Sequence, residues 1–132
     1  MVMNMRILLV AIWLIGASVA CKRGGGGAAG GGGINVNAGP AAAREIYNQR
    51  CTTCHGASGT GDGPAGAALT PRPRSFSDQQ WQALTTDDQL RRVIVQGGAA
   101  VGKSPLMPPN PDLEGRPEVV AGLVQIIRTA RR

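Results

Sequence analysis

Apolar residues divide the chain into three parts. The first, residues 1–20, contains an unbroken apolar run from Ile7 to Ile15. The second, residues 21–39, is dominated by glycine and has too few apolar side chains to bury a core. In the third, residues 40–132, apolar residues recur at the intervals of an amphipathic helix. We therefore expect a leader, a flexible linker and one folded domain.

Four segments of the folded part have helical patterns. We expect helices over residues 41–50, 78–84, 87–96 and 117–130. No segment alternates polar and apolar residues as a strand does, so the pattern predicts an all-α fold. The last helix has the clearest apolar face, which consists of Val119, Val120, Leu123, Val124, Ile126 and Ile127.

Residues that begin or end helices support these limits. Ser77 and Thr86 can each accept a hydrogen bond from an unpaired backbone N–H at a helix start. Gly97 and Gly98 stop the third helix. The stretch 56–73 is rich in glycine, and we expect an irregular loop there that lets the backbone approach a flat ligand closely.

The composition limits both the core and the partners. Beyond residue 20 the only aromatic side chains are Tyr47, Phe76 and Trp81, so the core is thin and a bound apolar group would complete it. Lys and Arg number 14 against 8 Asp and Glu, without the aromatic-rich basic patch of a nucleic-acid binder. This excess is either an ordinary solvated surface or a means of steering the protein to an acidic redox partner or an anionic membrane.

The stretch Cys51-Thr52-Thr53-Cys54-His55 carries the clearest chemistry. It is a Cys-x-x-Cys-His motif, the signature of c-type haem attachment, in which two thiols form thioethers and the histidine binds iron. A bare Cys-x-x-Cys would also suit a thiol–disulfide pair or half of a zinc site. No strand-rich stretch flanks the motif, and no Cys or His follows it. These observations favour one haem c bound covalently to Cys51 and Cys54, with His55 as an iron ligand.

Met107 is the best candidate for the second iron ligand. His55 is the only histidine, and the other methionines fall within the first five residues. Prolines beside Met107 stiffen its loop, which a weak thioether ligand needs. Two alternatives stay open, because Met107 could fill a gap in the core and Lys103 could bind the iron at raised pH.

Residues 40–132 resemble a class I c-type cytochrome, the small kind with one haem. The resemblance rests on four segments in the same order, at residues 51–56, 59–64, 69–73 and 106–109. It implies an all-α fold of four to five short helices around one covalently bound haem. It also implies that the first and last helices cross beside the haem.

The resemblance further implies roles for single residues. In such cytochromes a proline after the haem motif packs near the iron-bound histidine, and a backbone carbonyl there accepts a hydrogen bond from its ring. Pro64 is our match for this proline, and Pro71 is the second candidate. Relatives often carry an aromatic residue where this chain has Ile126 and Ile127, so we expect the helix crossing to depend on Tyr47 alone.

The N-terminal part predicts export. Residues 1–20 combine one arginine, an apolar run and small residues, as secretory signal peptides do. Cys21 follows in a sequence that resembles a bacterial lipobox, whose cysteine is acylated, although Ser18 replaces the usual aliphatic residue. Ordinary cleavage would instead leave Cys21 as a free thiol. With a lipid on Cys21, the linker 21–39 is a membrane tether on the periplasmic side.

We therefore expect a one-electron carrier of the bacterial cell envelope, without catalytic activity. Its partners would be redox proteins of a respiratory or other electron-transfer chain. Lys103, Arg72 and Arg74 either help such partners to dock or are simply solvated. One alternative is a haem-bearing subunit of a larger membrane oxidoreductase. Another is a ligand-binding or peroxidatic haem protein, if Met107 does not hold the iron.

Overall fold

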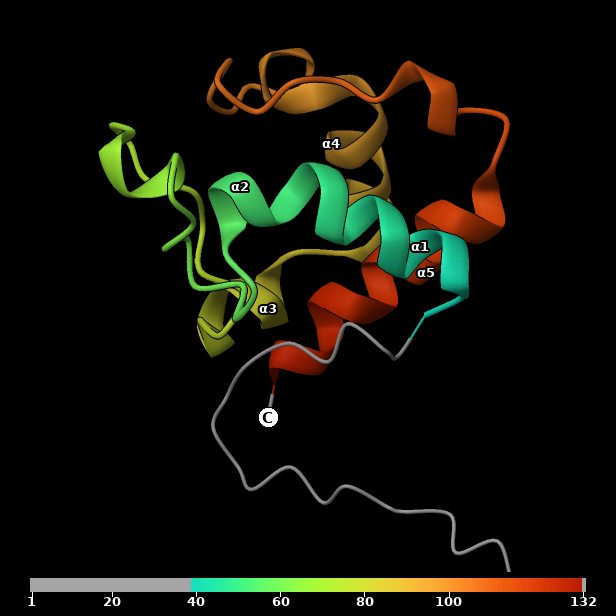
Figure 1. Ribbon diagram of the computed structural model, residues 1–132, viewed down its shortest axis with the longest axis horizontal. Coiled ribbons are helices and arrows are strands. Elements are labelled where there is room, and N and C mark those ends of the chain that lie inside the picture. Colours follow the sequence, from blue (N-terminus) through green and yellow to red (C-terminus); the bar gives the residue numbers. More distant parts are fainter. Residues whose placement is uncertain (1–38, 132) are drawn as a thin grey trace, which may run out of the picture.

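The computed structural model describes residues 39–131, and every regular element in that range is a helix (Figure 1). The all-α prediction is confirmed. The α-helices are α1 (Ala41–Ile46), α2 (Thr52–His55), α3 (Gln79–Leu84), α4 (Asp87–Ala100) and α5 (Pro117–Arg128). A π-helical turn, Tyr47–Cys51, joins α1 to α2, and 3-10 turns lie at Gly66–Ala68, Pro111–Leu113 and Thr129–Arg131.

Within these described residues, no helix has both the length and the apolar character required to cross a membrane. The expected signal peptide, residues 1–20, lies outside the described residues, and so do Cys21 and the rest of the expected linker up to residue 38.

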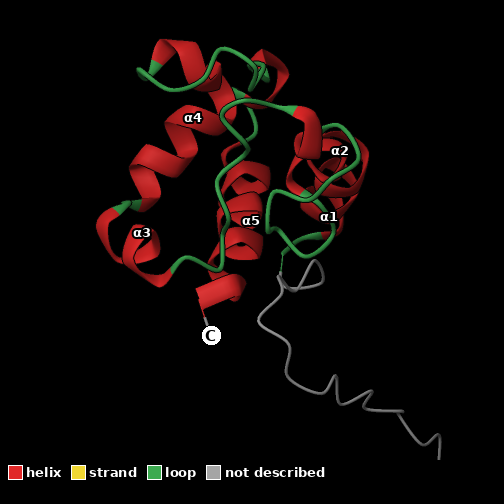
Figure 2. Cartoon of the chain, turned by 90° about the vertical axis from the view of Figure 1, so that its left-hand side faces the viewer, coloured by secondary structure: helices red, strands yellow, loops and turns green. Residues whose placement is uncertain are grey.

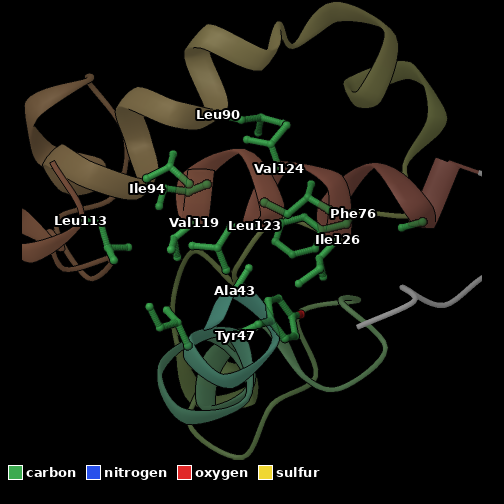
Figure 3. Close-up of a cluster of buried hydrophobic side chains, with 14 residues drawn as sticks. Ala43, Tyr47, Phe76, Leu90, Ile94, Leu113, Val119, Leu123, Val124 and Ile126 are labelled. Carbon is green, nitrogen blue, oxygen red and sulfur yellow. The ribbon is translucent and has the colours of Figure 1, made fainter. Parts of the chain in front are cut away.

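Helix α5 is the centre of the core. Figure 2 shows it between α4 and α1, and Figure 3 shows side chains from all three helices meeting along it. Its predicted apolar face is confirmed, because the six residues of that face are between 0% and 7% exposed. On α4, Leu90 and Ile94 are buried in the same cluster, whereas Val93 and Val95 are half-buried.

Helices α1 and α5 cross at small residues. A Cβ added at Gly122 would lie 2.5 Å from Pro40 Cδ and 2.7 Å from Ala43 Cβ, so the crossing leaves no room for a side chain there. Tyr47 also packs in this region, 1% exposed, and its hydroxyl donates to the Gly56 carbonyl at 2.9 Å. The prediction that the crossing depends on Tyr47 alone was therefore wrong, because the close approach requires a glycine on α5.

Side-chain hydrogen bonds start two of the helices. At α4, Thr86 Oγ1 accepts from the Gln89 N–H at 3.2 Å, and Gln89 Oε1 accepts from the Thr86 N–H at 2.8 Å. The predicted Thr86 cap is confirmed. At α3 the predicted cap, Ser77, was wrong by one residue, because Asp78 accepts from the Trp81 N–H at 3.0 Å. A carboxylate is the stronger acceptor and also favours the positive end of a helix.

The predicted stop at Gly97 and Gly98 is a kink in α4. Gly97 has φ 78° and ψ 171°, a conformation that glycine adopts most readily, and the chain then makes one more helical turn to Ala100. The helix therefore changes direction after Gln96 and continues beyond it.

Helices α3 and α5 are joined through the buried amide of Gln82, which is 1% exposed. Its Nε2 donates to the carbonyl oxygens of Phe76 at 2.8 Å and Ile127 at 2.9 Å. Arg128 donates to Gln82 Oε1 at 2.6 Å and pairs with Asp87 of α4 at 2.8 Å. The side-chain amide thus has all its hydrogen bonds, and three helices are linked at this point.

Candidate functional site

A cavity of about 1040 Å³ is lined by residues of the segments 50–55 and 69–76, of α3 and α4, and of the loop 101–110. Its volume is just above the roughly 300–1,000 Å³ typical of pockets for cofactors and other small molecules. Cys51, Cys54 and His55 reach it from the first helical segment, and Met107 reaches it from the loop. The structure thus brings these four predicted residues to one cavity.

His55 forms part of the cavity wall. Its ring stacks on Phe76, with centroids 4.6 Å apart and 20° between the planes, and Phe76 stacks on Trp81 at 5.8 Å. The Nδ1 atom is buried and has no hydrogen-bond partner among the described residues. Burial lowers the pKa of His55, and the adjacent backbone of Arg74 acts in the opposite sense. The imidazole is therefore neutral at pH 7, which is the form that binds metals.

Cys51 and Cys54 do not form a disulfide with each other. Burial raises the pKa of Cys51 to about 11 and outweighs the opposing charge of Arg50. The thiol is therefore protonated at neutral pH, unlike the low-pKa thiolate of a disulfide oxidoreductase. Across residues 39–131, no three His, Cys, Asp or Glu side chains lie close enough to share a metal ion. The raised pKa of Cys51 favours the haem interpretation over the thiol–disulfide one.

The loop that carries Met107 is held against the kink of α4. The Gly98 N–H donates to the Met107 carbonyl at 3.0 Å, and the Met107 N–H donates to the Ser104 carbonyl at 3.3 Å. A Cβ at Gly98 would collide with the Ser104 carbonyl oxygen, and one at Gly97 would lie 2.8 Å from the nitrogen of Pro109. The glycine pair was predicted only to stop a helix, but it also lets the Met107 loop approach closely.

The structure does not bring Pro64 to this cavity. Pro64 is exposed and lines a separate, more open pocket of about 530 Å³ beside Thr53 of α2. Pro71, the second candidate, lines the main cavity, and the backbone next to the His55 ring belongs to Arg74. The segment 71–74 therefore lines the cavity beside His55, where the family resemblance had led us to expect Pro64.

Basic side chains gather at the cavity, and acidic ones do not. Among the described lining residues none is acidic and five are basic, namely Arg50, Arg72, Arg74, Arg92 and Lys103. Arg50 and Arg74 have ion pairs, with Asp112 and Asp78. The other three have none within the described part of the chain. The cavity therefore has a positive potential that favours anionic groups.

Sequence analysis assigned no role to Phe76, Trp81 or Asn110, which all line the cavity. The two aromatic residues had a signal, since the folded part contains only three aromatics and aromatic side chains are common in the lining of small-molecule pockets. Asn110 had none. Its Nδ2 donates to the Ile94 carbonyl at 2.8 Å, across 16 positions of sequence, and no local pattern reveals that contact.

Comparison with protein families relates the chain to a known family. A family model described as "Cytochrome C oxidase, cbb3-type, subunit III" matches residues 38–126. This range contains the Cys-x-x-Cys-His motif, the Met107 loop and most of α5. A comparison with curated proteins finds no match.

Proposed function

Because the chain belongs to the family of cbb3-type cytochrome c oxidase subunit III, it is a c-type haem protein of electron transfer, and we propose that it is a one-electron carrier of the bacterial cell envelope. The family supports a small c-type cytochrome with covalent haem. Three points go beyond the family match and belong to the proposal. They are that four named residues hold a single haem, that the protein acts as an electron carrier, and that it works in the cell envelope.

The observation that carries the proposal is that Cys51, Cys54, His55 and Met107 line one cavity. In this proposal the two cysteines form thioethers to one haem c, and His55 and Met107 are the iron ligands. The haem supplies the redox chemistry, by taking up and releasing one electron. Ligation by a thioether raises the reduction potential of a haem iron, so Met107 as a ligand would favour ferrous over ferric iron.

The other residues of the cavity suit a haem. Its wall includes the aromatic side chains of Phe76 and Trp81 and the apolar side chains of Leu90 and Ile94. The basic residues at the same cavity favour the two propionate groups of a haem, which are anionic at neutral pH. A flat apolar group with two carboxylates therefore matches both the lining and the charge of the cavity.

The lining favours electron transfer over peroxide chemistry. Apart from His55, Lys103 and the two motif cysteines, the described lining residues include none of the usual general acids or bases, and no Asp, Glu or Tyr is among them. With Met107 on the iron, no ligand position remains for a substrate. We therefore propose that the protein is not an enzyme.

An acidic redox partner would dock beside this cavity. Arg72, Arg92 and Lys103 are exposed there, and the apolar side chains of Leu84 and Leu106 are 73% and 49% exposed. Long-range attraction by the basic residues would speed encounter, and the small apolar contact would allow rapid release. Such a surface suits a transient complex better than a permanent one.

The family description favours a second candidate, a haem-bearing subunit of a larger oxidoreductase. Purification from mildly solubilised membranes separates the two functions. A carrier is expected to purify alone, and its electron exchange with an acidic partner is expected to slow as salt is added. A stoichiometric partner protein that survives purification would contradict the carrier proposal.

We also propose that residues 1–20 are removed on export and that Cys21 is acylated. The support is the signal-like composition of residues 1–20 and the glycine-rich stretch after Cys21. The linker 21–39 would then hold the haem domain at the periplasmic face of the membrane. Mass spectrometry of the mature N-terminus is expected to show a lipid on Cys21, and an unmodified cysteine would end the anchor proposal.

A further inference from the structure

Arg50 connects the haem-motif helix to the loop that carries Met107. It directly precedes Cys51, and its Nη1 donates to Asp112 Oδ1 at 2.9 Å and to Asn110 Oδ1 at 3.3 Å. Among the described residues, no other hydrogen bond joins the segment 41–55 to the segment 101–113. The bond with Asp112 raises the pKa of Arg50 and lowers that of Asp112, so both groups stay charged at neutral pH.

Asn110 extends this connection to α4. Its Nδ2 donates to the Ile94 carbonyl at 2.8 Å, and its backbone N–H donates to the Val95 carbonyl at 2.9 Å. Only Pro108 and Pro109 separate Asn110 from Met107. Proline rings fix φ, so these two residues transmit the position of Asn110 to Met107 with little freedom.

We propose that Arg50 is a positioning residue that holds the Met107 loop against the haem-motif helix and thereby keeps Met107 on the iron. The inference rests on the proposed function, since it requires Met107 as an iron ligand. Haem attachment fixes one side of the site through Cys51 and Cys54. The bond between Arg50 and Asp112 would hold the Met107 loop relative to that side.

The expected size of the effect follows from exposure. The side chains of Arg50 and Asp112 are 42% and 50% exposed, so solvent and salt weaken their attraction. Exposed ion pairs change equilibria by about two- to fivefold. The pair should therefore tune how firmly Met107 is held, and haem binding itself should not depend on it.

The test is an imidazole titration of the ferric holoprotein, in which imidazole displaces Met107 from the iron. Loss of the Met–ferric charge-transfer band measures the displacement. Arg50→Gln is expected to raise the apparent affinity for imidazole about two- to fivefold. The control is Arg91→Gln, because Arg91 also has an exposed ion pair, with Asp88 at 3.2 Å, and does not line the cavity. This control removes the same charge and should leave the affinity unchanged.

Asp112→Asn tests the same bond from the loop side. Because Asp112 is far from the attachment motif in sequence, this variant replaces Arg50→Gln as the test if Arg50→Gln impairs haem attachment. The double variant Arg50→Gln/Asp112→Asn should match Arg50→Gln, because Arg50→Gln already removes the bonds to both Asp112 and Asn110. Asp112→Asn keeps the bond to Asn110 and should have an equal or smaller effect. Added salt should raise the imidazole affinity of the natural protein and have a smaller effect on the double variant.

Two failures can be told apart. If the natural protein lacks the charge-transfer band, Met107 is not an iron ligand and the proposed function is itself overturned. If the band is present but Arg50→Gln, Asp112→Asn and Arg91→Gln bind imidazole with equal affinity, the role of Arg50 is overturned and the proposed function stands.

Discussion

The core around α5 and the wall of the cavity are built differently. Along α5 the packing is so close that Gly122 has no room for a Cβ, and the buried side chains of the core are at most 7% exposed (Figure 3). At the cavity, Leu84 and Leu106 are 73% and 49% exposed, and much of the wall is loop. In the core around α5, side chains of the protein fill the space themselves. At the cavity, a haem would fill the space that the side chains leave. The two regions should therefore respond to different changes.

Preventing haem attachment should have the largest effect. In the double variant Cys51→Ala/Cys54→Ala, nothing would hold a haem covalently in the cavity of about 1040 Å³. We expect the loss of most of the roughly 5–15 kcal/mol that stabilises a small domain. Thermal unfolding followed by the fluorescence of Trp81 measures this loss, with Met107→Ala as the control that keeps both cysteines. A cooperative transition within a few degrees of the holoprotein would contradict the expectation.

Filling the helix crossing should damage the packed core instead. In Gly122→Val the new side chain would collide with Pro40 and Ala43, and we expect a loss of about 1–3 kcal/mol. The haem spectrum should not change, since this glycine does not line the cavity. Urea unfolding measures the loss. Gly115→Ala is the control, because a Cβ there has no atom within 4 Å; equal stability of the two variants would refute the tight crossing.

Replacing the buried amide should have an effect of similar size. Gln82→Leu leaves the carbonyl oxygens of Phe76 and Ile127 without their donor, and we expect a loss of about 1–3 kcal/mol in the free energy of unfolding. Because α3 carries Trp81, the fluorescence of the folded state should also change. Gln80→Leu on the exposed face of α3 is the control. If the Gln82 variant unfolds at the same temperature as the Gln80 variant, the network contributes nothing.

Removing the α4 cap should have the smallest effect. Thr86→Ala loses the acceptor for the Gln89 N–H, and we expect a loss of about 1 kcal/mol. Thr86→Ser keeps a hydroxyl and should retain most of the stability. Chemical denaturation of the two variants decides the point, and indistinguishable midpoints would show that the capping box is dispensable.

Local patterns were enough to predict much of this protein. The helical period located the apolar face of α5, the capping residue Thr86 followed from its position, and the Cys-x-x-Cys-His motif needed only residue spacing. Counting methionines singled out Met107, which the structure places at the same cavity as the motif; its role as an iron ligand stays a prediction. These features depend on residues that are close in sequence or unusual in the composition.

The features that were missed depend on distant contacts. Gln82 bonds a carbonyl 45 positions away, and Arg50 bonds Asp112 at a separation of 62. A glycine is needed at position 122 because α1 crosses α5 there. The sequence of α5 alone does not reveal this requirement. The path of the loop 56–73 likewise depends on tertiary packing, which explains why Pro64 lies away from the cavity.

The most direct test of the account is the absorption spectrum of the purified holoprotein, ferric and ferrous, with and without CO. The account predicts a Met–ferric charge-transfer band that is lost in Met107→Ala, and a ferrous haem that does not readily bind CO. Ready binding of CO by the natural protein, without that band, would contradict the claim that His55 and Met107 together close the iron site.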